Sequence, residues 1–291
     1  MTSLITAVDH VPVVVADLDA AVAAYSTLLG RTPNWRGKLE SARHAWFQLP
    51  NIALDLIAAD GAGAGADAIR ARLAKYGEGP AAIAWRTADL DETVRRLSRR
   101  ALQFGPIGVT RSVCEDGRER TWRYAEARQS TTRGLAMMWI EQASAAWPLS
   151  PPVTEEAAAV ASVDHIVVHT QSADGCVALY GGRLGLDLRL DRANAAWNAH
   201  QLFFACADMV IEAGAAMKPD PARSGERDRL GGLAWRVSDP HAAQARLAAA
   251  GIDVSEVRKG RKPGTEVFTI RSGVPGAPYL MLKPSPELAA D

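Results

Sequence analysis

The hydrophobic and polar positions form a pattern that is repeated four times along the chain: a β-rich run, a helix-like stretch, and further β-rich runs. The first copy opens with DHVPVVVADLDAAVAAYSTLLG at residue 9, and the third opens with DHIVVHTQSADGCVALYGGRLG at residue 164. The second and fourth copies share Ala-Trp-Arg, at 84–86 and 234–236. This repetition predicts four βαβββ modules.

The helix-like stretches carry their own start and stop signals. An Asp or Ser precedes each one and is a candidate N-cap, because its side chain accepts hydrogen bonds from the first free backbone N–H groups. In the first stretch Gly30 marks the end of the helix. The apolar positions there have spacings of three and four, which predicts an amphipathic helix: Leu18, Val22, Tyr25 and Leu28.

The modules are expected to pair into two domains. One sheet with one helix covers only one face, so the other face must meet a partner or line a cavity. We place the modules at about 5–60, 80–143, 161–214 and 230–285. A proline-containing stretch separates the halves, which predicts domain 1 over 1–145, a linker over 146–160 and domain 2 over 161–291. The predicted fold class is α+β.

Composition narrows the classes of function. The chain has 33 Lys+Arg and 33 Asp+Glu, which argues against nucleic-acid and membrane-surface partners. Its three cysteines form no CxxC motif, which favours a reducing compartment. There is no apolar run of about 20 residues and no signal-peptide pattern at the N-terminus. We therefore expect a cytoplasmic protein with a small-molecule substrate, and a homodimer stays open.

The repeated openings and the closing strands LDLI, WIEQ and MVIE resemble the vicinal oxygen chelate superfamily, especially its glyoxalase-like domain branch. That superfamily contains glyoxalase I, the bleomycin- and fosfomycin-resistance proteins and the extradiol dioxygenases. The resemblance implies that each pair of modules forms an open, curved sheet, or cup, around one divalent metal ion. The metal ligands come from the first and last strand of each module.

Carried onto this chain, the resemblance implies a set of metal ligands in each domain. In domain 1 the set is His10, Asp55 and Glu141, and in domain 2 it is His165 and Glu212. Ala82 and Gly232 occupy the first-strand positions of the other two modules, and Leu282 or Lys283 the last strand of the fourth. Imidazole with carboxylates suits Fe, Mn, Zn, Ni or Co. Glu141 and Glu212 are also candidates for moving a proton.

Further polar residues are candidates for substrate binding. His169 shares a strand face with His165 but lies about 13 Å away at strand rise, too far to share its metal. Arg86 and Arg236 occupy the same offset in the second and fourth modules and suit a carboxylate or enolate oxygen. His44 and His200 begin the equivalent third strands of the first and third modules. Alternatively, the two arginines lie at solvated strand ends, and His44 and His200 are ordinary polar residues at the start of a strand.

Three functions remain open. The leading hypothesis is a divalent-metal-dependent, glyoxalase-like enzyme. It acts on a small oxygenated anion by isomerase, lyase or hydrolase chemistry, through a metal-stabilised enolate or oxyanion. The second is a metal-free small-molecule binding or resistance protein, which the missing ligands at Ala82 and Gly232 favour. The third is an extradiol-type dioxygenase with an atypical iron site. Domain 1 keeps more ligand positions, so we expect the active site there.

Overall fold

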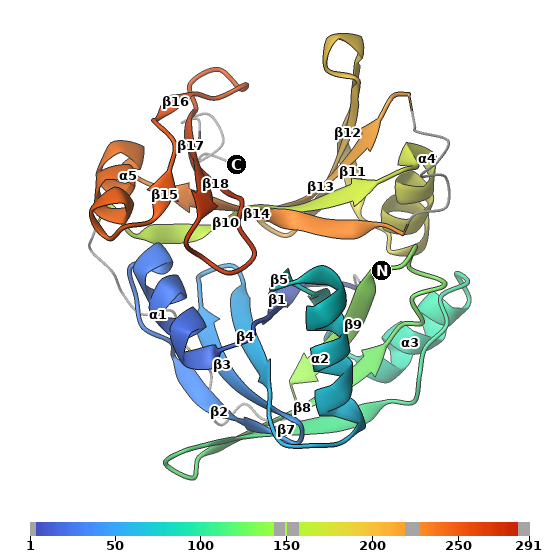
Figure 1. Ribbon diagram of the computed structural model, residues 1–291. Helices are drawn as coiled ribbons and strands as arrows, with labels where there is room; N and C mark the ends of the chain where they lie inside the picture. The colour runs from blue at the N-terminus through green and yellow to red at the C-terminus, as the bar shows by residue number, and fades with distance from the viewer. Residues whose placement is uncertain (1–3, 143–148, 150–156, 219–226, 285–291) are drawn as a thin grey trace.

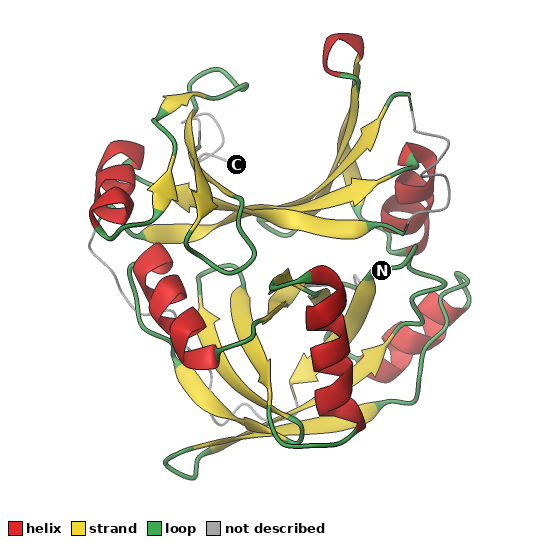
Figure 2. Ribbon diagram, in the orientation of Figure 1, coloured by secondary structure: helices red, strands yellow, loops and turns green. Residues whose placement is uncertain are grey.

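The computed structural model of the chain describes residues 4–142, 149, 157–218 and 227–284. Each half of the chain builds one curved sheet with helices on its convex side, which confirms the predicted α+β fold (Figures 1 and 2). The concave inner face of the first sheet is called cup 1 below, and that of the second sheet cup 2. The predicted linker, 146–160, lies mostly outside the described residues, and its bounds stay a prediction.

The first sheet carries two modules in chain order. Its elements are β1 (Ala7–Val14), α1 (Leu18–Leu29), β2 (Trp35–Leu39), β3 (Ala42–Gln48), β4 (Ala53–Ala59), α2 (Ala64–Tyr76), β5 (Gly79–Pro80), β6 (Ala82–Arg86), α3 (Leu90–Ser98), β7 (Gly108–Cys114), β8 (Glu119–Glu126) and β9 (Ala136–Gln142). The helix α2 fills the connector between the modules, where only Ala66 of the helix is buried.

The second sheet repeats this plan with a different second module. Its elements are β10 (Val160–Thr170), α4 (Ala173–Cys176), the π-helix η1 (Val177–Arg183), β11 (Asp187–Asn194), the 3₁₀-helix η2 (Ala195–Trp197), β12 (Ala199–Cys206), β13 (Met209–Ala216), β14 (Arg229–Val237), α5 (Pro240–Ala249), β15 (Asp253–Val254), β16 (Arg258–Lys259), β17 (Glu266–Ser272) and β18 (Tyr279–Lys283).

The two sheets close differently. In the first sheet the strand order is β4-β3-β2-β7-β8-β9-β6-β1, and β1 also pairs with β4, so the strands form a closed ring. The seam of this ring is short, because β2 and β7 pair only through Gly37–Cys114 and Lys38–Val113. In the second sheet, no pairing among the described strands joins β11 to the β15–β17 end. The expected open sheet is therefore found in cup 2, whereas cup 1 is closed at a seam (Figure 1).

The helices start and pack as the sequence pattern predicts. The predicted N-caps accept hydrogen bonds from backbone N–H groups of their own helices: Asp17, Asp89, Ser172 and Asp239. The whole apolar stripe of α1 is buried, and Gly30 ends the helix in the left-handed conformation at φ 68°. Full burial of a side chain such as Leu28 contributes about 1.5–3 kcal/mol, so this stripe ties α1 firmly to the sheet.

The two halves share one hydrophobic core and several polar contacts. The hydroxyl groups of Tyr25 and Tyr279 lie 2.6 Å apart across the domain interface. Arg133 donates two hydrogen bonds, at 2.8 and 3.2 Å, to the buried carboxylate of Asp228. These contacts join the convex sides of the halves and leave both cups facing away from the interface (Figure 1).

Candidate functional site

Strand register decides which predicted residues face the cups. Successive side chains of a strand point to opposite faces. On β1 His10 pairs with Ala53 of β4, and Pro12 pairs with Asp55, so His10 and Asp55 lie on the same face. The equivalent pairing, of Val167 with Glu212, puts His165 and Glu212 on one face of the second sheet. Each cup therefore receives one histidine and one carboxylate from adjacent parallel strands.

A β-bulge turns the aspartate before each histidine toward it. The pairing of β1 with β6 slips between Val8 and His10, and that of β10 with β14 slips between Val163 and His165. Such a bulge bends the strand and re-aims its side chains. As a result His10 Nδ1 lies 2.9 Å from Asp9 Oδ1. This geometry explains why Asp-His opens both odd-numbered modules.

In cup 2 an arginine completes this arrangement. His165 Nδ1 lies 2.8 Å from Asp164 Oδ1, and Arg236 Nε donates to Asp164 Oδ2 at 2.7 Å. Burial by itself raises the pKa of Asp164, but His165 and Arg236 outweigh it, so this pKa lies below its ordinary value. An ionised carboxylate only accepts hydrogen bonds, so Nδ1 of His165 carries the proton and Nε2 faces the cup.

The same triad exists in cup 1. Arg86 Nε donates to Asp9 Oδ2 at 2.8 Å, and Asp9 in turn holds His10. Burial raises the pKa of Asp9, and the neighbouring His10 and Arg86 lower it further than burial raises it. Arg86 and Arg236 were expected to meet substrate at the cup mouth. The structure instead engages them with the aspartates, so they orient the histidines through those aspartates.

Cup 2 extends the triad into a chain of polar side chains across five strands. Glu212 Oε2 lies 3.2 Å from His165 Nε2, and Gln201 donates to Glu212 Oε1 at 2.9 Å. Arg192 of β11 donates to Gln201 Oε1 at 3.2 Å. The side chains of His165 and Glu212 are 12% and 17% exposed, so solvent reaches the pair.

Cup 1 uses its carboxylate differently. Asp55 Oδ1 lies 2.7 Å from His44 Nδ1, His44 Nε2 lies 2.6 Å from Ser112 Oγ, and Trp35 Nε1 donates to the same oxygen at 2.7 Å. The order Ser-His-Asp is that of a hydrolase triad. However, Ser112 and His44 are 0% exposed, and Asp55 is 2% exposed. We therefore interpret these residues as a buried network that joins β4, β3, β7 and β2 across the seam.

Three of the predicted candidates do not join either cluster. Glu141 lies on the convex face of β9, where it accepts a hydrogen bond from Leu90 N and pairs with Arg123. His200 faces away from cup 2 and contacts Asp191, because Gln201 holds the position equivalent to His44. His169 is exposed near the end of β10.

The register also corrects the last-strand positions. Asp55 is opposite Pro12, and the equivalent partners in the second and fourth modules are Met138, opposite Ala84, and Leu280, opposite Ala234. Glu141, the expected ligand of the second module, is thus three residues beyond Met138. In the fourth module, Leu282 and Lys283 are two and three residues beyond Leu280. At these last-strand positions the second and fourth modules contribute apolar side chains.

We tested whether the residues of each cup fit a divalent metal ion. In cup 1 the carboxylate of Asp55 is engaged by His44 in a fully buried network. In cup 2, His165 Nε2 and Glu212 Oε2 are close enough to be neighbouring ligands, since two donors about 2.1 Å from one ion lie about 3 Å apart. Nevertheless, the described residues contain no group of three or more His, Cys, Asp or Glu that could hold an ion. The donor sets therefore do not fit the metal site that the resemblance implies.

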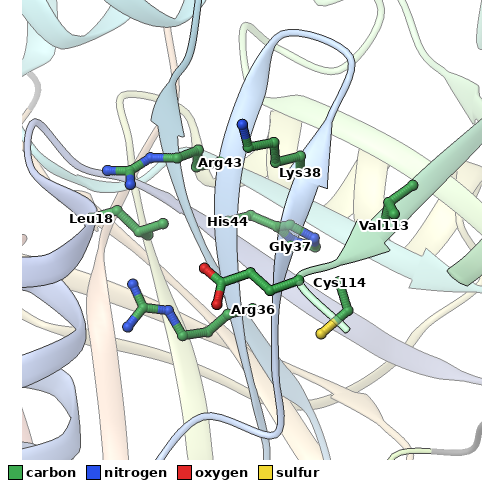
Figure 3. Close-up of a pocket in the computed structure, with 9 residues that line it drawn as sticks. Leu18, Arg36, Gly37, Lys38, Arg43, His44, Val113 and Cys114 are labelled. Atoms are coloured by element: carbon green, nitrogen blue, oxygen red, sulfur yellow. The ribbon is translucent and has the colours of Figure 1, made fainter. Parts of the chain in front are cut away.

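A small cavity of about 150 Å³ lies beside the start of α1, and His44 of the cup 1 network forms part of its lining (Figure 3). Its lining includes Arg36, Lys38 and Arg43. Figure 3 shows the guanidinium groups of Arg36 and Arg43 pointing toward Leu18. Both arginines pair with Asp19, and Lys38 lies 3.9 Å from Asp60, so the positive charge of this cavity is neutralised locally.

Comparison with known protein families agrees with the observed fold. The glyoxalase-like domain family matches residues 8–182, which is more than half of the chain. The chain belongs to the glyoxalase-like domain family. Residues 164–269 match the glyoxalase/bleomycin resistance protein/dioxygenase superfamily. A search of curated proteins gave no match.

Solved structures of this superfamily share the two-cup architecture. A mutant of 4-hydroxymandelate synthase from Streptomyces coelicolor is 12% identical, with 96% of this chain and 92% of that chain covered and a TM-score of 0.67. The Mn(II)-bound glyoxalase from Novosphingobium aromaticivorans is 18% identical, with 96% and 83% covered and a TM-score of 0.62. Identities this low establish the shared fold alone. Among the described helices of this family member, none is long and apolar enough to cross a membrane.

Proposed function

We propose that the protein is an enzyme whose active site is cup 2, and that it moves a proton on a small oxygenated anion. The observation that carries this proposal is the solvent-accessible pair of Glu212 and His165, 3.2 Å apart. Gln201 fixes the carboxylate and Asp164 fixes the imidazole, so both groups are held for one geometry. Pre-positioned acid–base groups of this kind typically contribute 10²–10⁴-fold to a rate.

The chain of contacts suggests a role for each residue. When a C–H bond next to a carbonyl breaks, its proton passes to Glu212 and its electron pair moves onto the carbonyl oxygen. Nε2 of His165 lies next to that carboxylate and shares the proton before it returns to carbon. Arg236 orients His165 through Asp164, and Arg192, at the other end of these contacts, attracts an anionic substrate. This sequence of steps is isomerase chemistry, because the proton returns to carbon and no group leaves.

This proposal departs from the metal-dependent version of the function. The Mn(II)-bound glyoxalase carries a metal, but among the described residues cup 2 supplies only His165 and Glu212 as a pair of donors for one. We therefore assign the proton transfer to the carboxylate–imidazole pair itself. Exchange activity that survives treatment with EDTA supports this assignment. Activity that EDTA abolishes and Mn²⁺ or Zn²⁺ restores would contradict it.

Hydrogen–deuterium exchange tests the proposal without knowledge of the substrate. The protein is incubated in D₂O with a panel of 2-oxo, 3-oxo and 2-hydroxy acids, and loss of the C–H signal is followed by ¹H NMR. We expect exchange with at least one acid, and Glu212→Gln should slow it by about 10²–10⁴-fold. The matched control is Asp55→Asn, at the equivalent position of cup 1, which should leave the rate within about twofold of wild type if the variant folds.

Two results would overturn the proposal. One is exchange that Asp55→Asn abolishes and Glu212→Gln does not, which would move the active site to cup 1. The other is a panel of acids that bind without any exchange, with affinities that Glu212→Gln does not change. That result would support the metal-free binding protein instead.

A further inference from the structure

Cup 1 contains an arginine surrounded by three indole rings. Arg120 of β8 pairs with Ser112, which places it on the inner face of the ring of strands. Its guanidinium carbon lies 4.9 Å from the ring centre of Trp46, 5.7 Å from that of Trp35 and 5.7 Å from that of Trp122. On its far side Trp46 packs against His10, with 4.7 Å between ring centres. We call Arg120 and the three indoles the arginine cage.

The guanidinium of the cage has unused hydrogen-bonding capacity. Nη1 of Arg120 is buried and has no hydrogen-bond partner. Leaving such a donor without an acceptor destabilises the folded protein, and more so when the group is charged. Burial lowers the pKa of Arg120, and the negative charges of Asp55 and Asp9 act in the opposite direction. Asp9 contacts His10 and Arg86, and Asp55 contacts His44. These two carboxylates therefore attract the guanidinium electrostatically but do not accept a hydrogen bond from Nη1.

The wall of cup 1 beside the cage is apolar and partly accessible. Tyr124 and Met138 face the inside of the ring and are only partly buried, and they pack against Trp122 and Ile140. These half-buried side chains show that water reaches this part of the inner face. The arginine cage adjoins the sealed seam network, because Trp35 donates to Ser112 and also lies beside Arg120.

We propose that the arginine cage is a binding site for a small, planar organic anion, such as an aromatic carboxylate. The carboxylate accepts the free N–H of Arg120, and charge-assisted hydrogen bonds of this kind are about twice as strong as neutral ones. The ring of the ligand stacks on Trp122, where aromatic contacts favour planar groups. This inference concerns a different cup from the proposed active site and stands independently of it.

Calorimetric titration with two isosteric probes tests the proposal. Benzoate carries the carboxylate, and benzamide replaces it with a neutral amide of the same shape. We expect benzoate to bind with one-to-one stoichiometry and a Kd of about 1 mM or tighter, and benzamide to bind at least about tenfold more weakly. Quenching of tryptophan fluorescence should follow the same binding curve. Since this comparison uses the unaltered protein, it does not depend on the folding of a variant.

Variants then locate the site. Arg120→Met should weaken benzoate binding by about tenfold or more, and Arg120→Lys should weaken it less. The matched control is Arg118→Met, because Arg118 also lies over Trp35, at 5.5 Å, but is 44% exposed and paired with Asp116. Arg118→Met and Glu212→Gln should both leave benzoate binding unchanged. Thermal melts confirm that each variant is folded.

Several outcomes would overturn the arginine cage as an anion site. These are the absence of saturable benzoate binding up to about 10 mM, equal affinity for benzoate and benzamide, and wild-type affinity in folded Arg120→Met. Loss of benzoate binding in Glu212→Gln would place the anion in cup 2 and would also overturn it. None of these outcomes bears on the exchange experiment, whose readout is proton transfer in cup 2.

Discussion

Cup 1 and cup 2 begin from the same residues and end with different sites. In both, a bulged Asp-His pair on the first strand is held by an arginine of the neighbouring module. The carboxylate opposite is Asp55 in cup 1 and Glu212 in cup 2, and the third-strand residue is His44 in one and Gln201 in the other. Cup 1 therefore differs from cup 2 at two side chains and in the closed seam. With these differences, cup 1 contains a buried structural network and cup 2 an accessible acid–base pair.

The length of the carboxylate side chain explains part of this difference. Glu212 is one methylene longer than Asp55, and its carboxylate lies 3.2 Å from His165. The shorter Asp55 contacts His44 of the adjacent strand β3 instead. The seam explains the rest. In cup 1 the pairing of β2 with β7 supplies Ser112, which completes the network around His44, and cup 2 has no described equivalent of that pairing. The two cups of this chain therefore share the arrangement of the first strand and differ in the residues that the other strands place beside it.

The largest predicted effect removes the buried carboxylate. Asp55→Ala should destabilise the protein by about 3–5 kcal/mol, because it leaves His44 buried without its partner. The matched change in cup 2, Glu212→Ala, should cost about 1 kcal/mol, because His165 there remains in contact with water. Urea unfolding followed by circular dichroism measures both. Equal losses in the two variants would contradict the division into a structural and an accessible cluster.

The next effect acts on the seam itself. A Cβ at Gly37 would lie 2.7 Å from Ser112 Oγ and 2.7 Å from the backbone oxygen of Val113, so Gly37→Ala must push β2 and β7 apart. We expect a loss of about 1–3 kcal/mol. Gly214→Ala in β13 is the matched control, since nothing lies within 4 Å of its Cβ position, and it should be within about 0.5 kcal/mol of wild type. A neutral Gly37→Ala would show that the seam does not hold cup 1 together.

A smaller effect tests what the cups share. The pKa values of Asp9 and Asp164 lie below the ordinary value of 3.8, so these carboxylates stabilise the folded state above that pH, and the stabilisation is lost as pH falls through the lower, folded-state pKa. Removing Arg236 takes away one cause of the lowered pKa. Arg236→Met should therefore begin to lose thermal stability at a higher pH than wild type, as should Arg86→Met in cup 1. Melting temperatures between pH 2.5 and 7 measure this shift, and unchanged acid profiles in both variants would contradict it.

The sequence predicts the fold and the first-strand histidines well, because both depend on local patterns. Four repeats of strand and capped helix identify the modules, and period-two alternation places His10 with Asp55 and His165 with Glu212. Contacts between distant strands carry no such local pattern. The closure of cup 1 depends on two residue pairs between β2 and β7, and Ser112 and Arg120 enter the cup from strands of the second module.

Some missed residues did leave a signal in the sequence. Asp9 and Asp164 precede the two histidines, and the repeated Asp-His dipeptide points to them as much as to the histidines. His200 was predicted instead of Gln201 because the sequence does not fix the alignment of this strand to within one residue. A shift of one residue moves a side chain from the concave face of the sheet to the convex face. Glu141 was misassigned for the same reason. Ile140 and Gln142 point to the opposite face of β9 from Glu141. Only the pairing of β9 with β8 and β6 shows which of the two faces is concave.

The smallest predicted effect follows from that reassignment. Glu141 accepts a hydrogen bond from Leu90 N at the start of α3 and pairs with Arg123, with 26% of its side chain exposed. Glu141→Gln keeps the acceptor and loses the charge at the helix N-terminus, which is worth about 0.3–1 kcal/mol. Proton exchange in cup 2 and benzoate binding in cup 1 should both stay at wild-type levels. A hundredfold loss of exchange in this variant would mean that Glu141 reaches a reacting group, and would return the active site to the first half of the chain.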